Sequence, residues 1–214
     1  MSARVTALVL AGALVASPLA AQVARFAGAD GSIYRVRFRS AVQGGGEALS
    51  GFATGAQARF VRGRGTMEVS YAQGRLTAET GSAAPRSLVD GSLAFAFRPK
   101  PWLVLKAGPH LRGYVAPSGT ERWVFWEARA RGESAIIPDV LKAHLEGWVA
   151  LASSVNVDPG AGGAHGGEAG LTLRLPQLPF SVRFAYAVDR AKLANDARSE
   201  TVEAVFLGIT YSRR

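Results

Sequence analysis

The sequence predicts an all-β protein, an up-and-down antiparallel transmembrane β-barrel of about ten strands. Segments that alternate apolar and polar residues follow one another after residue 22, and most of them run for ten or more residues. A tilted strand needs about 9–11 residues to cross a bilayer. The connections alternate between short turns and longer loops, which is typical of membrane barrels with two unlike rims. Segment length and loop alternation together predict this fold class.

The first residues predict a cleavable signal peptide. Arg4 precedes an apolar run from Val5 to Ala16, Pro18 interrupts the chain, and Ala21 closes a stretch of small residues. A run of this length is short for a transmembrane helix of about 20 residues, so it favours cleavage over an N-terminal anchor. We expect a signal peptide at residues 1–21, cleaved after export through the inner membrane, and one barrel domain at residues 22–214.

Composition limits the remaining choices. Of the 214 residues 48% are hydrophobic and 19% are charged, which excludes a disordered chain. Because the chain contains no cysteine, it has no disulfides, no thiol catalysis and no thiolate metal sites. The formal net charge of +9 would suit nucleic acid or an anionic surface. Export of the mature chain argues against nucleic acid as a partner.

Ten segments have the composition or alternation of β-strands, and each boundary is expected within a few residues. They cover residues 33–42, 51–62, 66–77, 87–98, 102–114, 120–131, 140–153, 166–175, 179–189 and 199–212. A misread hairpin would give eight or twelve strands. With an even number, both termini lie at the rim of short turns.

The connections are expected to differ between the two rims. One set is mostly short and covers residues 63–65, 99–101, 132–139 and 176–179. The other set is longer or more polar and covers residues 43–50, 78–86, 156–166 and 189–198. Residues 116–119 depart mildly from the pattern. The alternation predicts short turns at one rim and long loops at the other.

The quality of the two faces predicts which one meets lipid. In the last segment one row is Val205, Leu207, Ile209 and Tyr211, all apolar or aromatic. The opposite row contains small residues, as do the opposite rows of other segments, where charges join them. Small residues mixed with charges suit a crowded interior, so the apolar rows are predicted to face lipid.

The segment "YRVRFRS", residues 34–40, sharpens this prediction. Period-2 alternation places its three arginines on one face and Tyr34, Val36 and Phe38 on the other. We expect the aromatic and aliphatic face to meet lipid and the arginines to face the lumen, among partner charges. The full set of expected lumen charges is Arg35, Arg37, Arg39, Glu68, Arg98, Glu127, Arg129, Lys142, Glu146, Glu168, Arg174 and Arg183.

The chain resembles the small outer-membrane β-barrels of Gram-negative-type bacteria. The resemblance is carried by the signal peptide, the amphipathic strands, the loop asymmetry and the final strand, "VFLGITYSRR". Gly208, Ile209 and Tyr211 match that family's C-terminal assembly signal in part, although Ser212, Arg213 and Arg214 follow the aromatic residue. The resemblance implies a location in the outer membrane, with its lipid as partner.

Three functions remain open. The first is a structural or surface barrel, or a narrow porin-like pore in which the cationic lumen prefers small anions. The second is a lipid-modifying hydrolase or acyltransferase, for which His144, Glu146 and Ser153 are the candidate catalytic residues. The third is a soluble periplasmic barrel that binds an apolar ligand. We expect no metal site and no cofactor, and a non-enzymatic role is favoured.

Overall fold

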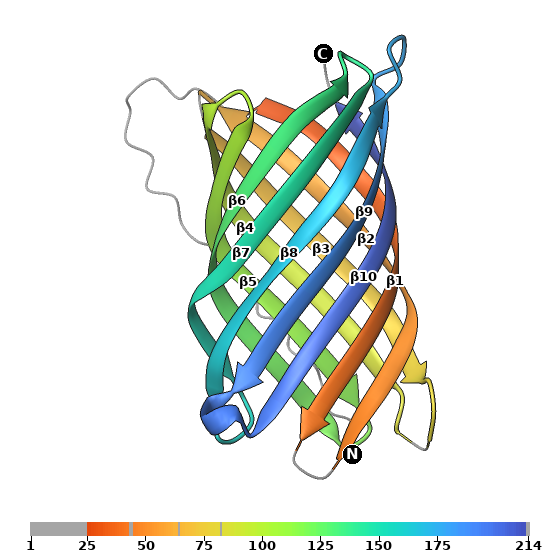
Figure 1. The fold of residues 1–214 in the computed structure, drawn as a ribbon, viewed down its shortest axis with the longest axis vertical. Helices are drawn as coiled ribbons and strands as arrows, with labels where there is room; N and C mark the ends of the chain where they lie inside the picture. The colour runs from red at the N-terminus through yellow and green to blue at the C-terminus, as the bar shows by residue number, and fades with distance from the viewer. Residues whose placement is uncertain (1–24, 43–44, 64, 82, 213–214) are drawn as a thin grey trace, which may run out of the picture.

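Ten antiparallel strands close into one barrel in the computed structural model (Figure 1). The structure describes residues 25–42, 45–63, 65–81 and 83–212, so the expected signal peptide lies outside the described residues. Each strand pairs with its sequence neighbours, and β1 also pairs with β10 to close the ring. The strands are β1 (Arg25–Val42), β2 (Gly45–Arg62), β3 (Gly65–Ala78), β4 (Arg86–Lys100), β5 (Leu103–Ala116), β6 (Gly119–Ile137), β7 (Leu141–Val155), β8 (Ala161–Arg174), β9 (Phe180–Leu193) and β10 (Arg198–Ser212).

The strands are longer than a membrane crossing requires. They contain 14 to 19 residues, whereas about 9–11 suffice for the hydrocarbon layer. At about 3.3 Å per residue they extend about 45–60 Å along their own tilted direction. The wall therefore continues several residues beyond any hydrocarbon layer that it crosses.

The two rims differ less than the sequence predicts. We call the rim with connections 63–64, 101–102, 138–140 and 175–179 the turn rim, and the opposite rim the loop rim. β1 begins at Arg25 and β10 ends at Ser212, both at the turn rim, as expected for an even strand number. The predicted loop 43–50 is wrong, because Gly45 already pairs with Val42. The predicted loop 156–166 is likewise shortened by β8, since glycines extend the strand ladder instead of leaving it.

A short helix, the 3₁₀ turn η1 (Ala194–Asp196), joins β9 to β10 at the loop rim. Within the described part of the chain, no helix combines the length and the apolar composition needed to cross a membrane.

The outside of the barrel is apolar around its whole circumference. In β10, Leu207 and Ile209 are 54% and 57% exposed, whereas Phe206, on the opposite face of the strand, is 7% exposed. The predicted outward row of the last segment is therefore confirmed. Every strand contributes a large exposed apolar side chain to this apolar band: Ile33, Phe52, Val69, Phe95, Leu105, Trp126, Leu145, Leu171, Phe184 and Leu207. Strand number, closure and inside-out polarity confirm the predicted fold class.

The prediction for residues 34–39 is wrong. Val36 and Phe38 are 3% and 0% exposed and point into the barrel, so Arg35, Arg37 and Arg39 lie on the outer face. The phase is set by the neighbouring strands, since Phe38 pairs in register with the inward residues Leu49 and Val202. Alternation within one segment fixes two faces but does not say which of them is inside.

The outward arginines are accommodated near the loop rim. Arg37 forms an ion pair with Glu79, with Nη2 and Oε2 2.7 Å apart, and Arg39 forms one with Glu203. The guanidinium carbon of Arg35 lies 5.9 Å from the centroid of the Phe52 ring, a cation–π distance. Arg37 and Arg39 thus lie on the wall beyond the apolar band, whereas Arg35 lies at its edge, next to the band residue Phe52.

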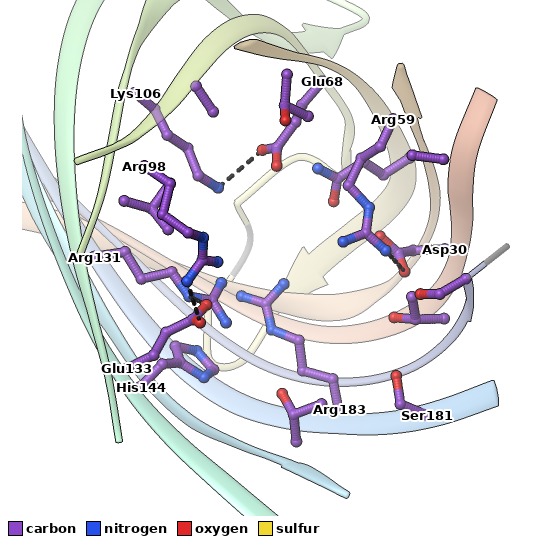
Figure 2. A pocket seen from close by; sticks show the side chains of 18 of the residues that line it. Asp30, Arg59, Glu68, Arg98, Lys106, Arg131, Glu133, His144, Ser181 and Arg183 are labelled. Carbon is purple, nitrogen blue, oxygen red and sulfur yellow. Dashed lines mark hydrogen bonds and ion pairs between the residues drawn. The ribbon is translucent and has the colours of Figure 1, made fainter. Parts of the chain in front are cut away.

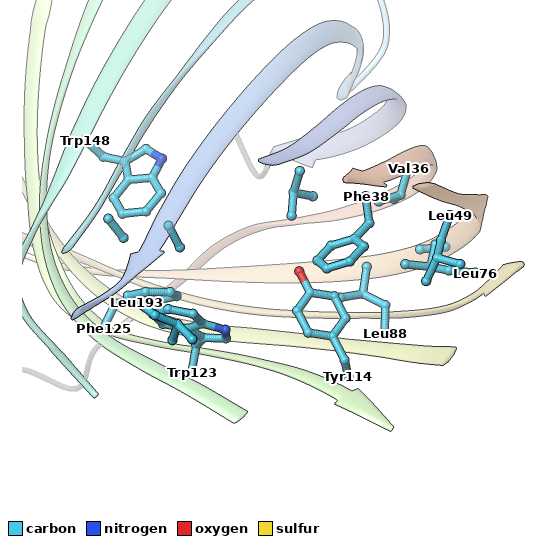
Figure 3. Packing of buried hydrophobic residues seen from close by; sticks show 14 residues of the cluster. Val36, Phe38, Leu49, Leu76, Leu88, Tyr114, Trp123, Phe125, Trp148 and Leu193 are labelled. Atoms are coloured by element: carbon cyan, nitrogen blue, oxygen red, sulfur yellow. The ribbon is translucent and has the colours of Figure 1, made fainter. Parts of the chain in front are cut away.

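An apolar cluster fills the lumen toward the loop rim (Figure 3). Trp123 stacks on Phe125, with ring centroids 5.7 Å apart, and Phe38 lies 4.8 Å from Tyr114. We call this cluster the plug. Its largest members are Val36, Phe38, Leu49, Leu76, Leu88, Tyr114, Trp123, Phe125, Trp148 and Leu193. They come from eight strands, so the plug joins most of the wall.

Candidate functional site

The lumen contains three zones. The plug occupies the end near the loop rim. A network of charged side chains lies in the middle, and a cavity lined by cationic residues lies near the turn rim. This order follows from where each inward residue falls along its strand. Arg98 and Ser212 lie at the turn-rim ends of β4 and β10, whereas Leu76 and Leu193 lie at the loop-rim ends of β3 and β9.

Arg112 is the centre of the ionic network. Its Nε donates to Oδ2 of Asp90 at 2.8 Å, and its Nη2 donates to Oδ2 of Asp189 at 2.7 Å. The other oxygen of Asp189 accepts a 2.7 Å hydrogen bond from Nε1 of Trp148. His110 places Nε2 3.0 Å from the same Asp90 oxygen that Arg112 contacts. The guanidinium group thereby links β4, β5 and β9, and Asp189 extends the link to β7.

The network continues toward the turn rim through His110. Its Nδ1 lies 3.3 Å from Oε2 of Glu127, whose other oxygen accepts a 2.8 Å hydrogen bond from Nε of Arg129. Nη1 of Arg129 donates to Glu146 at 3.0 Å, and Nζ of Lys106 lies 3.7 Å from that carboxylate. Cations and anions alternate along this chain of contacts, so each charge has a compensating neighbour.

Such a network is favourable only when it is complete. Burying a charge is costly unless it is paired and hydrogen-bonded, and charge-assisted hydrogen bonds are stronger than neutral ones. His110, Arg112, Glu127 and Glu146 are all less than 9% exposed, and each has a charged partner. The network therefore fills the middle of the lumen with mutually compensated charge around a cavity of about 230 Å³.

The cavity at the turn rim has a volume of about 410 Å³. We call it the vestibule. Two ion pairs lie in its wall: Nζ of Lys106 is 2.8 Å from Glu68, and Nη2 of Arg59 is 3.6 Å from Asp30. Cations outnumber carboxylates along its wall. The cations are Arg59, Arg98, Lys106, Arg131, Lys142 and Arg183, and the carboxylates are Asp30, Glu68 and Glu133.

Arginine side chains crowd one side of the vestibule. The guanidinium groups of Arg131 and Arg183 point into it from β6 and β9 and approach one another (Figure 2). Arg98 and Arg131 share the carboxylate of Glu133, at 3.1 Å and 3.3 Å. Arg183 forms an ion pair with Glu168. Two guanidinium groups on one carboxylate leave positive charge that is not neutralised locally.

The expected lumen charges fall into three groups. Those that face the lumen are Glu68, Arg98, Glu127, Arg129, Lys142, Glu146, Glu168 and Arg183. Arg174 ends β8 at the turn rim, where it lines a separate pocket of about 280 Å³. Arg35, Arg37 and Arg39 lie outside, so the expectation for them is wrong, as described above.

The candidate catalytic residues do not converge. His144 and Glu146 both point into the lumen, and Nε2 of His144 lies 2.7 Å from Glu168. Ser153 lies nine residues along the same extended strand, which corresponds to about 30 Å. No hydroxyl is activated across that distance. His144 and Glu146 instead belong to the ion-paired lining.

Several lumen residues were not among the expected charges. Lys106, Arg131 and Glu133 lie inside, together with Asp30 and Arg59. Lys106 is the one charged residue in the apolar stretch "LVLKAGP". It lies an even number of positions from His110 and Arg112, hence on the same face of the strand, and this is the signal that could have identified it. Glu133 falls in the predicted connection 132–139, since β6 continues to Ile137, whereas Arg131 ends the predicted strand 120–131.

Among the described residues, no group of three or more histidine and carboxylate side chains is arranged to hold a metal ion.

Comparisons with known proteins find similar folds among solved structures. No family model matches the chain, and no curated protein matches it. Solved structures of small outer-membrane β-barrels do match. Neisserial surface protein A is 10% identical over 86% of this chain and 97% of its own, with a TM-score of 0.39. The translocator domain of the autotransporter NalP from Neisseria meningitidis is 10% identical over 90% of both chains, with a TM-score of 0.46.

An outer-membrane channel from Pseudomonas putida F1 is also similar. It is 10% identical over 92% of this chain and all of its own, with a TM-score of 0.49. The three structures are those of a surface protein, a translocator domain and a channel.

Proposed function

We propose that the chain is an outer-membrane barrel that acts as a structural or surface protein and does not conduct solutes. The observation that carries this proposal is the plug. Trp123, Phe125 and Tyr114 are 1–2% exposed and meet aliphatic side chains from the opposite wall. Beside these rings the buried Glu200 forms an ion pair with Arg198, and the cavity that they share measures only about 10 Å³. Such a closely packed cross-section leaves no open path for ions.

The outer surface supports membrane insertion. A soluble protein rarely exposes a large continuous apolar patch, whereas here exposed apolar side chains encircle the barrel. This distribution also argues against the soluble periplasmic carrier, which would need polar residues outside. An open sheet edge cannot exist in hydrocarbon, and the closed ring has none.

The outward cations indicate how deep the barrel sits. Seven of them lie within seven residues of the loop rim, and together we call them the collar: Arg35, Arg37, Arg39, Arg75, Arg122, Arg190 and Lys192. A cationic residue on the lipid face costs about 2–4 kcal/mol at the bilayer midplane but about 0–1 kcal/mol near the interface. The collar therefore belongs at the headgroup level or above it, with the apolar band below.

The enzymatic alternative has little support. Lipid hydrolysis or acyl transfer needs a nucleophile, a base and access to a lipid ester at one place. His144 and Glu146 lie inside the barrel and Ser153 is far along the strand, so these conditions are not met together. The anion-selective pore is the remaining alternative, because the vestibule is cationic.

Conductance separates the sealed barrel from the pore. The full mature chain, reconstituted into planar lipid bilayers, is expected to produce no stable channels when a general porin under the same conditions does. Reproducible conductance with anion preference would overturn the sealed-barrel proposal and support the pore. Fractionation tests location: a heat-modifiable band in the outer membrane is expected, and release with the periplasm would contradict it.

A further inference from the structure

We propose that the vestibule is a binding site for a small phosphate-bearing anion that enters from the turn rim. The established features of a barrel require the lumen to be filled, but they do not require it to carry surplus positive charge. Six cationic side chains line the vestibule against three carboxylates. A cleft lined by one sign of charge focuses the electrostatic field and raises the local concentration of the opposite ion.

The excess of positive charge in the vestibule remains when the neighbouring carboxylates are included. Glu146 and Glu168 contact Lys106 and Arg183 from the side of the ionic network. Glu146 is shared with Arg129, which lies outside the vestibule, so it neutralises Lys106 only in part. Lys142 is exposed and, among the described residues, has no ion pair. It would meet an anion first, at the mouth.

The donors suit a phosphate group. Arginine presents a planar fork of N–H groups that matches phosphate and carboxylate oxygens. Arg131 and Arg183 point into the cavity and toward one another (Figure 2). Nε of Arg183 is buried and has no hydrogen-bond partner, whereas Nε of Arg131 lies 3.3 Å from Oε1 of Glu133. Nδ1 of His144, which also lines the vestibule, is buried without a partner as well.

Size and access favour a small ligand. A volume of about 410 Å³ holds a phosphate ion or a phosphate ester with a short polar tail, together with water. The plug closes the far side, so the ligand enters and leaves by the turn rim and is not transported through. Phosphate as a free ion and phosphate as a lipid headgroup fragment share this chemistry.

Binding can be measured on the full mature chain folded in a non-ionic detergent. Inorganic phosphate and glycerol 3-phosphate are titrated separately by isothermal calorimetry at low salt, and folding is checked by the heat-modifiable band. Saturable binding with a stoichiometry near one is expected for at least one of them, weakening as salt is added. The tighter of the two identifies the free ion or the headgroup fragment as the preferred form.

Charge-matched variants locate the site. The double variant Arg131→Gln, Arg183→Gln should weaken binding about tenfold or more, because it removes two charge-assisted donors. The control Arg37→Gln, Arg39→Gln removes the same charge from the collar and should leave affinity within about twofold. If the vestibule variant does not fold, Lys142→Gln at the exposed mouth should still weaken binding severalfold. Absence of saturable binding, or equal effects of vestibule and collar variants, would overturn the proposal.

Discussion

The guanidinium group of Arg112 on β5 reaches the carboxylate of Asp189 on β9 across the lumen, with Nη2 and Oδ2 2.7 Å apart. These strands are not neighbours in the sheet, since β6, β7 and β8 lie between them on one side. The contact therefore joins opposite parts of the wall. It is the interior counterpart of the backbone ladder, because it resists changes in the cross-section that hydrogen bonds between adjacent strands do not resist.

Breaking this contact should destabilise the barrel strongly. Arg112→Met leaves Asp90 and Asp189 without their shared cation, and removing one partner of a buried pair costs about 3–5 kcal/mol. The measurement is the free energy of unfolding in urea, with the protein folded into lipid vesicles. Arg37→Met, whose guanidinium group lies on the exposed collar, serves as the control and should cost less than about 1 kcal/mol.

A compensating variant distinguishes lost charge from lost packing. When Asp189→Asn is added to Arg112→Met, one uncompensated carboxylate disappears, and part of the lost stability should return. Equal stability of wild type and Arg112→Met would contradict the role assigned to the network.

Two tryptophans on one strand test which face meets lipid. Trp123 is 1% exposed inside the plug, whereas Trp126 is 58% exposed on the outer surface. In vesicles of lipids with brominated acyl chains, a variant that keeps only Trp126 should lose much of its fluorescence. A variant that keeps only Trp123 should be little affected, because contact with the quencher requires exposure to lipid. Quenching of Trp123 in preference to Trp126 would reverse the assignment of the two faces.

The sequence predicts the architecture better than the phase of an individual strand. Strand number, closure and the outward row of β10 follow from segment length and from the contrast between the apolar row with Leu207 and Ile209 and the opposite row, which contains the small Ala204 and Gly208. Arg35, Arg37 and Arg39 were misplaced because the prediction assumed that every charge must avoid the outer face. That assumption fails for long strands, whose ends project beyond hydrocarbon, and only pairing with β2 and β10 reveals the phase.

The candidate site was predictable in kind but not in arrangement. Parity brings Glu127, Arg129 and Glu146 inward, and the structure shows that they are in contact. Parity says nothing about contacts across the lumen, which depend on strand tilt and stagger. The separation of a compensated network from a cationic vestibule depends on the height of each charge along the barrel axis. One sequence alone does not provide that height.

The collar should be accessible from outside the cell. Because the chain has no native cysteine, single replacements give unambiguous labelling. Arg37→Cys and Arg39→Cys are expected to react with a membrane-impermeant thiol reagent on intact cells, since both lie on the wall beyond the apolar band. Ile33→Cys, on the same face but within the apolar band, should not react. Labelling of Arg37→Cys only after the outer membrane is permeabilised would place the loop rim in the periplasm.

The plug should contribute stability through packing that is specific to the inside of the barrel. Trp123 stacks on Phe125 and donates from Nε1 to Glu121 at 2.9 Å, so Trp123→Ala removes a large ring and leaves a buried cavity. A loss of about 3–5 kcal/mol is expected from such a substitution. In a urea titration the unfolded chain is in water, so the measured free energy of unfolding includes the whole hydrophobic contribution of the buried ring.

Trp126→Ala provides the comparison within the same strand. Its ring lies on the outer face, where lipid can fill the vacated volume, so no rigid cavity remains and the loss should be smaller. Trp123→Phe should retain most of the stability, because an aromatic ring still fills the space beside Phe125 while only the hydrogen bond to Glu121 is lost. Equal losses for Trp123→Ala and Trp126→Ala would mean that the cluster is not a packed plug, and the argument for a sealed lumen would then lose its basis.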